Sequence, residues 1–279
     1  MVMLKKTVLQ LCLASMLLAT IPSVWAAPSY QVKNLKIGEL PVKTIVPITA
    51  RTASQAIAQA QQIAAHPDVD IAEFRIDLLD FAADNRQVIA LGHQLNQILK
   101  DKPLIATIRT HNEGGQMKIS DQDYEKTYQA YLQHPFMQLF DIEMFRDAKC
   151  VANLTQLAHQ QNILVIMSNH DFNQTPAQQD IEQRLLQQDQ MGADILKIAV
   201  MPKSKQDVMT LMNATQAVSQ KSTKPLLTMS MGQLGTLSRI ATANIGGSLS
   251  FGMIGEASAP GQIDVQQLQQ FLKTLQPSP

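Results

Sequence analysis

A lysine within an otherwise apolar segment carries the most reactive side chain that the sequence offers. Lys197 lies in DILKIAV (Asp194–Val200), between leucine and isoleucine. A buried lysine is costly because its ammonium group loses hydration. Burial also lowers the pKa of a lysine, and the free amine can then attack a carbonyl carbon. Lys197 is therefore a candidate imine-forming nucleophile, and the alternative is a side chain that points outward to solvent.

A histidine and a carboxylate occur at the ends of two other apolar segments. His170 follows ILVIMSN (Ile163–Asn169), and Glu143 ends MQLFDIE (Met137–Glu143). Histidine exchanges protons near neutral pH, and a neighbouring carboxylate can fix its tautomer and raise its basicity. Taken alone, His170 would be read as an ordinary loop residue. Together with Lys197 it predicts a general base and acid, oriented by Glu143.

The sequence contains no pattern for metal or nucleotide chemistry. No histidine pair has metal-ligand spacing, and the only cysteines are Cys12 and Cys150. Neither a P-loop nor a dinucleotide fingerprint is present. The segment GGSLSFG approaches a nucleophile elbow, but Ser250 replaces its second glycine. We therefore expect neither a metal nor a cofactor.

Composition describes a neutral globular protein. The 279 residues include 23 basic and 23 acidic side chains, which gives no basic surface for nucleic acid. With 45% hydrophobic and 16% charged residues, a large core is available and global disorder is excluded.

The first 26 residues have the order of a secretory signal peptide. Lys5 and Lys6 precede an apolar run from Thr7 to Ile21, and Val24–Ala26 has small residues at both ends. A membrane anchor is the alternative, but the run is short for a span of about 20 residues. We expect cleavage after Ala26, export to the periplasm of a bacterium, and no stable membrane insertion of the mature protein.

Short apolar segments alternate with longer amphipathic patterns, such as Ala53–Ala65 and Val151–Gln161, through residues 27–279. Eight such alternations in about 250 residues favour one α/β domain, a closed (β/α)8 TIM barrel, over an open doubly wound sheet. VKNLKIGEL (Val32–Leu40), with Gly38 between two short runs, predicts an N-terminal β-hairpin that closes the bottom. Thr175, followed by proline, predicts a helix N-cap. The expected strands cover residues 45–49, 69–77, 104–109, 137–143, 163–169, 194–200, 226–230 and 248–252.

The reactive residues fall at the predicted carboxyl ends of these strands, where barrels of this type carry their chemistry. Seven motifs contain them: EFRID (Glu73–Asp77), RTHNEGG (Arg109–Gly115), DIEMF (Asp141–Phe145), SNHDF (Ser168–Phe172), ILKIAV (Ile195–Val200), MGQLGTLSR (Met231–Arg239) and ASAPGQ (Ala257–Gln262). In order and spacing these motifs resemble type I 3-dehydroquinate dehydratase, the Schiff-base class, from about Ile37 to Leu275. The signal-like leader departs from the cytoplasmic biosynthetic members of that family.

The resemblance implies a hydro-lyase that converts 3-dehydroquinate into 3-dehydroshikimate and water. Lys197 would form the imine, His170 would move the proton and Glu143 would orient His170. Arg239 would bind the substrate carboxylate. The other residues that the resemblance assigns to the substrate site are Glu73, Arg75, Arg109, Ser258 and Gln262, with Met231 and Phe251 as apolar walls.

Two alternatives stay open from the sequence. A class I aldolase would use the same barrel and lysine but would cleave a carbon–carbon bond. An exported binding protein for cyclic hydroxy acids would need no lysine, histidine and glutamate on neighbouring strands. The expected partner is the small-molecule substrate, and the resemblance is compatible with a homodimer. The leader suggests breakdown of quinate or shikimate outside the cytoplasm.

Overall fold

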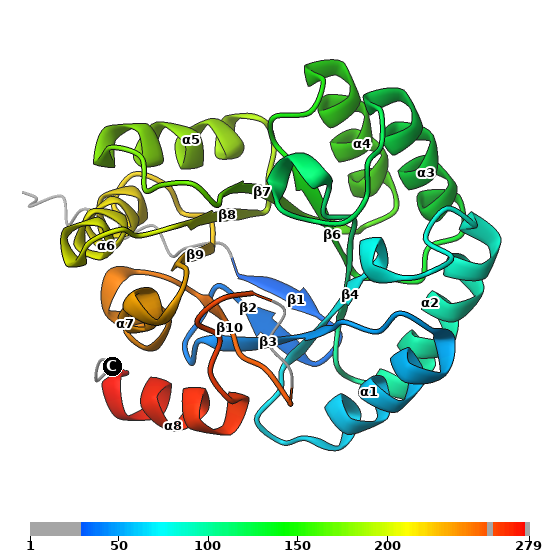
Figure 1. The fold of residues 1–279 in the computed structure, drawn as a ribbon, viewed down its shortest axis with the longest axis horizontal. Helices are drawn as coiled ribbons and strands as arrows, with labels where there is room; N and C mark the ends of the chain where they lie inside the picture. Colours follow the sequence, from blue (N-terminus) through cyan, green and yellow to red (C-terminus); the bar gives the residue numbers. More distant parts are fainter. Residues whose placement is uncertain (1–28, 256–258, 277–279) are drawn as a thin grey trace, which may run out of the picture.

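Eight parallel strands surround a common axis, and helices cover them on the outside (Figure 1). The computed structural model describes residues 29–255 and 259–276. The strands lie in the order β10-β3-β4-β5-β6-β7-β8-β9. The strands at the two ends of this order are joined where Ser248 N donates a 2.9 Å hydrogen bond to Leu226 O, so the barrel is nearly closed, as predicted. The barrel strands are β3 (Lys43–Ile48), β4 (Ile71–Arg75), β5 (Leu104–Thr107), β6 (Leu139–Glu143), β7 (Leu164–Asp171), β8 (Ile195–Val200), β9 (Leu226–Ser230) and β10 (Leu249–Phe251).

Six of the eight described α-helices begin at a polar side-chain cap that the sequence supplies. Thr52 forms a capping box with Gln55, and α1 covers Ala53–Ala65 as predicted. Helix α4 (Ala148–Gln160) starts three residues earlier than expected, because the Asp147 side chain accepts from Lys149 N and Cys150 N. The remaining helices are α2 (Asn85–Leu99), α3 (Asp121–Gln133), α5 (Gln178–Gln190), α6 (Lys205–Ser219), α7 (Thr236–Ile240) and α8 (Val265–Leu275).

The predicted N-cap at Thr175 is wrong. Helix α5 begins at Gln178 with Ala177 at the N-cap position, and no side chain caps it. The Thr175 hydroxyl instead donates to Met201 O at 3.1 Å. This hydroxyl therefore ties the loop before α5 to the end of β8.

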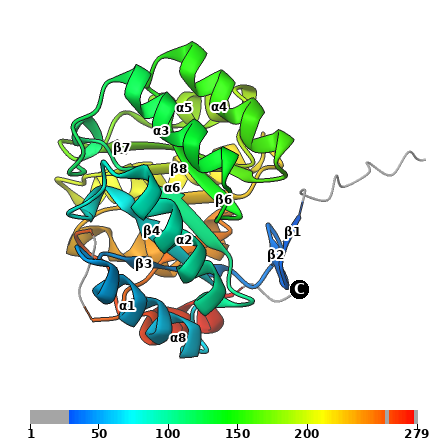
Figure 2. The same cartoon turned by 90° about the vertical axis from the view of Figure 1, so that its right-hand side faces the viewer.

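A two-stranded hairpin covers one end of the barrel (Figure 2). Strands β1 (Tyr30–Val32) and β2 (Leu35–Ile37) pair antiparallel. The chain turns at Lys33 and Asn34, not at Gly38 as the sequence suggested. Val32 and Ile37 pack with the inward side chains at the amino ends of the strands. The hairpin thus closes the bottom of the barrel, as predicted.

Apolar side chains fill the barrel below the level of the polar residues. Neighbouring strands meet in register as Ile45–Ile71 and Ile105–Leu139, and all four side chains are buried. A larger apolar cluster lies between the sheet and the outer helices. None of the helices in the described part of the chain is long and apolar enough to cross a membrane. Apolar packing inside the barrel and between the sheet and the helices therefore fixes the positions of the strands. The polar groups lie at the carboxyl ends of the strands.

Candidate active site

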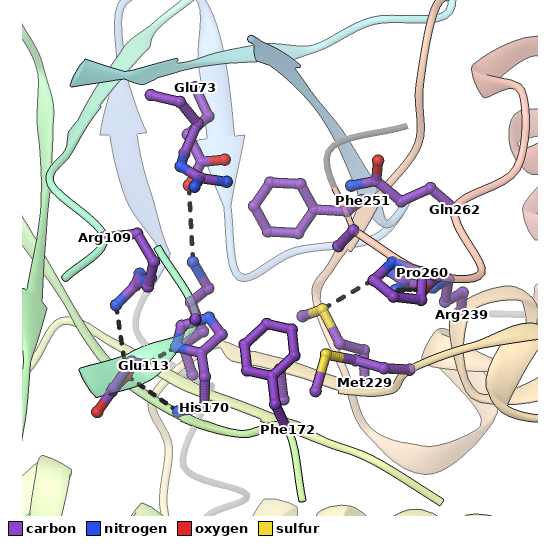
Figure 3. Close-up of a pocket in the computed structure, with 16 residues that line it drawn as sticks. Glu73, Arg109, Glu113, His170, Phe172, Met229, Arg239, Phe251, Pro260 and Gln262 are labelled. Atoms are coloured by element: carbon purple, nitrogen blue, oxygen red, sulfur yellow. Dashed lines mark hydrogen bonds and ion pairs between the residues drawn. The ribbon is translucent and has the colours of Figure 1, made fainter. Parts of the chain in front are cut away.

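A cavity of about 270 Å³ opens at the carboxyl ends of the barrel strands (Figure 3). Nine of the eleven predicted site residues line it, from six different strands or the loops that follow them. The other two are Glu143, which does not line this cavity, and Ser258, which lies outside the described residues. The nine are Glu73, Arg75, Arg109, His170, Lys197, Met231, Arg239, Phe251 and Gln262.

Lys197 points into the barrel rather than outward. Its side chain is 3% exposed, and its Nζ lies 2.8 Å from Asp141 Oδ2 and 3.7 Å from Glu73 Oε1. The Lys197 Nζ also lies over the Phe251 ring, 5.1 Å from the ring centre. Burial would raise the pKa of Asp141, but Arg109 and Lys197 outweigh burial and hold that pKa well below its usual value. Asp141 is therefore a fixed negative charge beside the lysine nitrogen.

His170 is paired with Glu113, which the sequence analysis had not assigned a role. His170 Nδ1 lies 2.8 Å from Glu113 Oε2, and the same oxygen accepts the backbone N–H of His170 at 3.0 Å. Burial, with Arg109 and Lys197 adding to it, lowers the pKa of His170 well below its usual value. Burial also raises the pKa of Glu113, to about 8. The imidazole is consequently uncharged at neutral pH.

The predicted pair of His170 with Glu143 is therefore wrong. Glu143 accepts instead from Thr110 N at 2.8 Å, from Thr110 Oγ1 at 2.7 Å and from Arg109 Nη1 at 2.9 Å. The reason is the path of the loop after β5. It turns back at Gly114, where φ is +80°, and carries Glu113 over to β7. A Cβ on Gly115 would lie 1.9 Å from Arg109 O, so only glycine allows this return.

Arg109 and Arg75 line the cavity but are already paired. Arg109 donates to Asp141 at 2.6 Å and to Glu143 at 2.9 Å, and these carboxylates raise the pKa of Arg109 although burial opposes them. Arg75 donates through Nε and Nη2 to the two oxygens of Asp77. Both arginines are therefore held in fixed positions at one side of the cavity.

Arg239 is different, because no ion pair neutralises it among residues 29–255 and 259–276. Within the described residues, its guanidinium contacts Met229 Sδ at 3.6 Å and Pro260 O at 3.4 Å (Figure 3), and its Nε has no hydrogen-bond partner there. The residue is 1% exposed, and burial lowers its pKa to about 10. A buried cation without a counter-charge favours an anionic ligand.

The cavity walls include two residues to which the sequence motifs assigned no role. The rings of Phe172 and His170 are stacked with their centres 6.5 Å apart, and Met229 faces Arg239. Ala259 and Pro260 bring the loop before α8 to the rim. The described residues contain no group of three or more His, Cys, Asp or Glu side chains arranged to hold a metal ion. The cavity thus combines an amine, an uncharged imidazole and an unpaired guanidinium between apolar walls.

Comparison with known proteins gives consistent matches. Residues 44–279 match the family profile described as Type I 3-dehydroquinase. The catabolic 3-dehydroquinate dehydratase of Acinetobacter baylyi is 72% identical over 260 residues, 93% of this chain and 95% of that protein. The crystal structure of the Clostridium difficile type I 3-dehydroquinate dehydratase superposes with a TM-score of 0.85 at 34% identity, covering 90% and 98%. That of the Enterococcus faecalis enzyme gives 0.83 at 38% identity, covering 88% and 99%.

Proposed function

Because this chain belongs to the type I 3-dehydroquinase family, we propose that it is a hydro-lyase that converts 3-dehydroquinate into 3-dehydroshikimate and water. The observation that carries the proposal is the shared cavity of Lys197, His170 and Arg239. An amine and a base within one site suit elimination next to a ketone, and an unpaired arginine suits a carboxylate.

The first step is imine formation at the ketone. The unprotonated amine of Lys197 attacks C3, and the carbinolamine loses water to give the iminium. Asp141, 2.8 Å from the nitrogen, supplies the negative charge that stabilises this cation. The iminium draws electrons from the neighbouring carbon, so the C2 proton becomes acidic.

The second step is proton transfer by His170. With Nδ1–H donated to Glu113, the Nε2 lone pair takes the C2 proton. The electron pair of the broken C–H bond moves into the iminium to give an enamine. The enamine then expels the C1 hydroxyl, which His170 protonates so that it leaves as water. A second water hydrolyses the imine, returns the lysine and releases the enone.

The substrate is held by charges that the fold has already fixed. Arg239 binds the carboxylate, while Glu73, Arg75, Arg109 and Gln262 surround the hydroxyls of the ring. Met231 and Phe251 form the apolar walls. Ser258 is included among the substrate-binding residues because it lies in the motif ASAPGQ. A bidentate arginine contact orients a carboxylate as well as binding it.

The test is an ultraviolet assay for the conjugated enone, combined with borohydride reduction in the presence of 3-dehydroquinate. The expected result is enone formation and a reduced adduct on Lys197, identified by peptide mass spectrometry. A binding protein would form no adduct, and an aldolase would yield two carbonyl fragments. Enone formation without any adduct on Lys197 would contradict the imine. A metal chelator should leave the rate unchanged.

The physiological part of the proposal is breakdown of quinate or shikimate outside the cytoplasm. The name of the Acinetobacter baylyi relative supports a catabolic role, and the lysines and apolar run of residues 1–26 support export. These residues lie outside the described part of the chain. Cell fractionation followed by N-terminal sequencing should recover a periplasmic protein that begins at Ala27. Light scattering on that protein tests the expected homodimer.

A further inference from the structure

A line of polar contacts runs from the surface of the barrel to His170, on the side away from the substrate cavity. Arg184 Nη1, on α5, donates to Asn169 Oδ1 at 3.0 Å. Asn169 Nδ2 lies 3.4 Å from Glu113 Oε1, and Glu113 Oε2 accepts from His170. Asn169 is 4% exposed, and neither Asn169 nor Arg184 lines the substrate cavity. Both line a separate outer cavity behind Glu113 and His170.

The two oxygens of Glu113 therefore have different partners. Adjacent residues of a strand point to opposite faces, so His170 and Asn169 reach Glu113 from different sides. His170 occupies Oε2, and the Asn169 amide is the side chain hydrogen-bonded to Oε1. A carboxylate held at both oxygens cannot turn about its terminal bond without losing a contact.

The direction of the Asn169 amide is fixed by Arg184. A guanidinium only donates hydrogen bonds. The oxygen of the Asn169 amide, and not its NH₂ group, must therefore face Arg184. The NH₂ group must then face Glu113, where it donates. With the amide reversed, oxygen would face carboxylate and NH₂ would face guanidinium.

From these contacts we infer that Asn169 and Arg184 are positioning residues for the proton transfer: Arg184 orients the Asn169 amide, and the amide holds Glu113 against His170. This inference rests on the proposed dehydration. It assigns a task to the asparagine of SNHDF and to an arginine of an outer helix.

The charges around the pair determine which way its pKa moves. Arg109, Lys197 and Arg75 face it with positive charge, and Glu143 and Asp141 face it with negative charge. The amide of Asn169 stabilises ionised Glu113, so its removal raises the pKa of the pair. The form in which His170 can accept a proton then appears only at higher pH.

The experiment compares Asn169→Leu, Asn169→Asp, Arg184→Met and the double variant Asn169→Leu/Arg184→Met. Asn169→Leu should lower kcat roughly tenfold, the value of a hydrogen bond to a charged group, with KM unchanged. Asn169→Asp faces Glu113 with a second carboxylate and should move the acid limb of kcat/KM furthest to higher pH. Arg184→Met should act in the same direction but less. In the Asn169→Leu background Arg184→Met should have little further effect, because it acts through the amide.

The matched control is Asn173→Leu. Asn173 lines the same outer cavity, and its side chain makes no hydrogen bond to Glu113, Asn169 or Arg184 in the described structure. This control should keep the wild-type kcat and pH limb. Thermal melting of each variant identifies any loss of folding, and Arg184→Met, on the outside of the barrel, provides the test if Asn169→Leu does not fold.

A second measurement does not depend on turnover. The His170 ring is titrated by NMR in the enzyme without substrate, and Asn169→Asp should raise its midpoint. An unchanged midpoint together with an unchanged pH limb would overturn the inference. Additive losses in the double variant, or a loss confined to KM, would overturn it as well. Failure of the wild-type enzyme to form the enone would overturn the proposed function. The NMR titration would still show whether the Asn169 side chain shifts the pKa of His170, because it does not depend on turnover.

Discussion

Lys197 carries out its chemistry beside a carboxylate that stays ionised. Asp141 is fully buried and accepts from Arg109, Ser168 and Lys197 within 2.8 Å. A negative charge 2.8 Å from the nitrogen stabilises the iminium once it has formed. The site therefore stabilises the cation on which elimination depends.

Lys197→Met should abolish turnover without unfolding the barrel. Methionine keeps the length and apolar stem of lysine, and Asp141 keeps Arg109 and Ser168 as partners. Enone formation at the background rate, with a cooperative thermal transition, is the expected outcome. Substantial residual activity in this variant would mean that another group forms the covalent bond, or that none is needed.

His170→Ala should reduce kcat by about 10²- to 10⁴-fold, the usual contribution of a general acid–base group. Lys197 would still form the imine, but neither C2 deprotonation nor imine hydrolysis would be assisted. Intact-mass spectrometry should therefore detect a larger fraction of enzyme bound to substrate than in the wild type. Turnover near the wild-type rate would identify a different base.

The His170–Glu113 pair predicts a specific pH dependence. Because burial raises the pKa of Glu113 to about 8, the pair holds an extra proton below that pH and cannot act as a base. Loss of the proton restores the base, so kcat/KM should rise with pH and level off above about 8. A rate that is flat between about pH 6 and 9 would contradict this assignment.

Glu113→Gln and Glu143→Gln separate the two glutamates. Glu113→Gln should remove the limb near pH 8 and lower kcat roughly 10- to 100-fold, because His170 loses a charged acceptor. Glu143→Gln should keep a limb, displaced slightly to lower pH, because Glu143 acts on Glu113 only through space. If both variants changed the pH dependence of kcat/KM equally, Glu113 would not be the specific partner of His170 in proton transfer.

At the scale of the elements, the strands were predictable because each is a short apolar run between polar segments. The segment at 226–230 was predicted to the residue, and Ala53–Ala65 was too because its cap is local in sequence. The hairpin was expected, but its turn was assigned to the glycine rather than to Lys33 and Asn34. Turns are less certain, since several residues tolerate the required backbone angles.

Most residues of the site were predictable from the sequence, but their pairings were not. Residues at strand ends converge because parallel strands share one carboxyl edge, and nine predicted residues do line the cavity. Which carboxylate reaches His170 depends on the return of the loop at Gly114 and Gly115. That path is a tertiary property, although the paired glycines directly after Glu113 signal that the loop can turn sharply.

The hairpin should stabilise the barrel without taking part in catalysis. Ile37 is fully buried and packs with the inward side chains at the amino ends of the strands, at the opposite end of the barrel from the cavity. Ile37→Ala should lower the free energy of unfolding by about 2–5 kcal/mol, while kcat at moderate temperature stays unchanged. Urea unfolding measures the first quantity, and Lys36→Ala on the exposed face is the control. A loss of kcat in the folded variant would argue against this separation.

For the molecule as a whole, packing and chemistry occupy opposite ends of the same strands. The amino ends carry isoleucine and leucine side chains, and the carboxyl ends carry the lysine, histidine and carboxylates. The buried carboxylates are tolerated at the carboxyl ends of the strands because each of them accepts a hydrogen bond. Apolar packing at the amino ends therefore fixes the positions of the strands, and this brings the polar groups together at the carboxyl ends.

The last prediction concerns the segment that precedes the barrel. Every described strand and helix lies between Tyr30 and Leu275, and the first strand of the hairpin begins four residues after the expected cleavage site at Ala26. A chain that begins at Ala27 should therefore have the same melting temperature and kcat/KM as the full-length chain, because it retains every described strand and helix. Both proteins are compared by calorimetry and by the enone assay. A clearly lower melting temperature for the shorter chain would mean that residues 1–26 pack against the barrel, and the interpretation of this segment as a removable export signal would then fail.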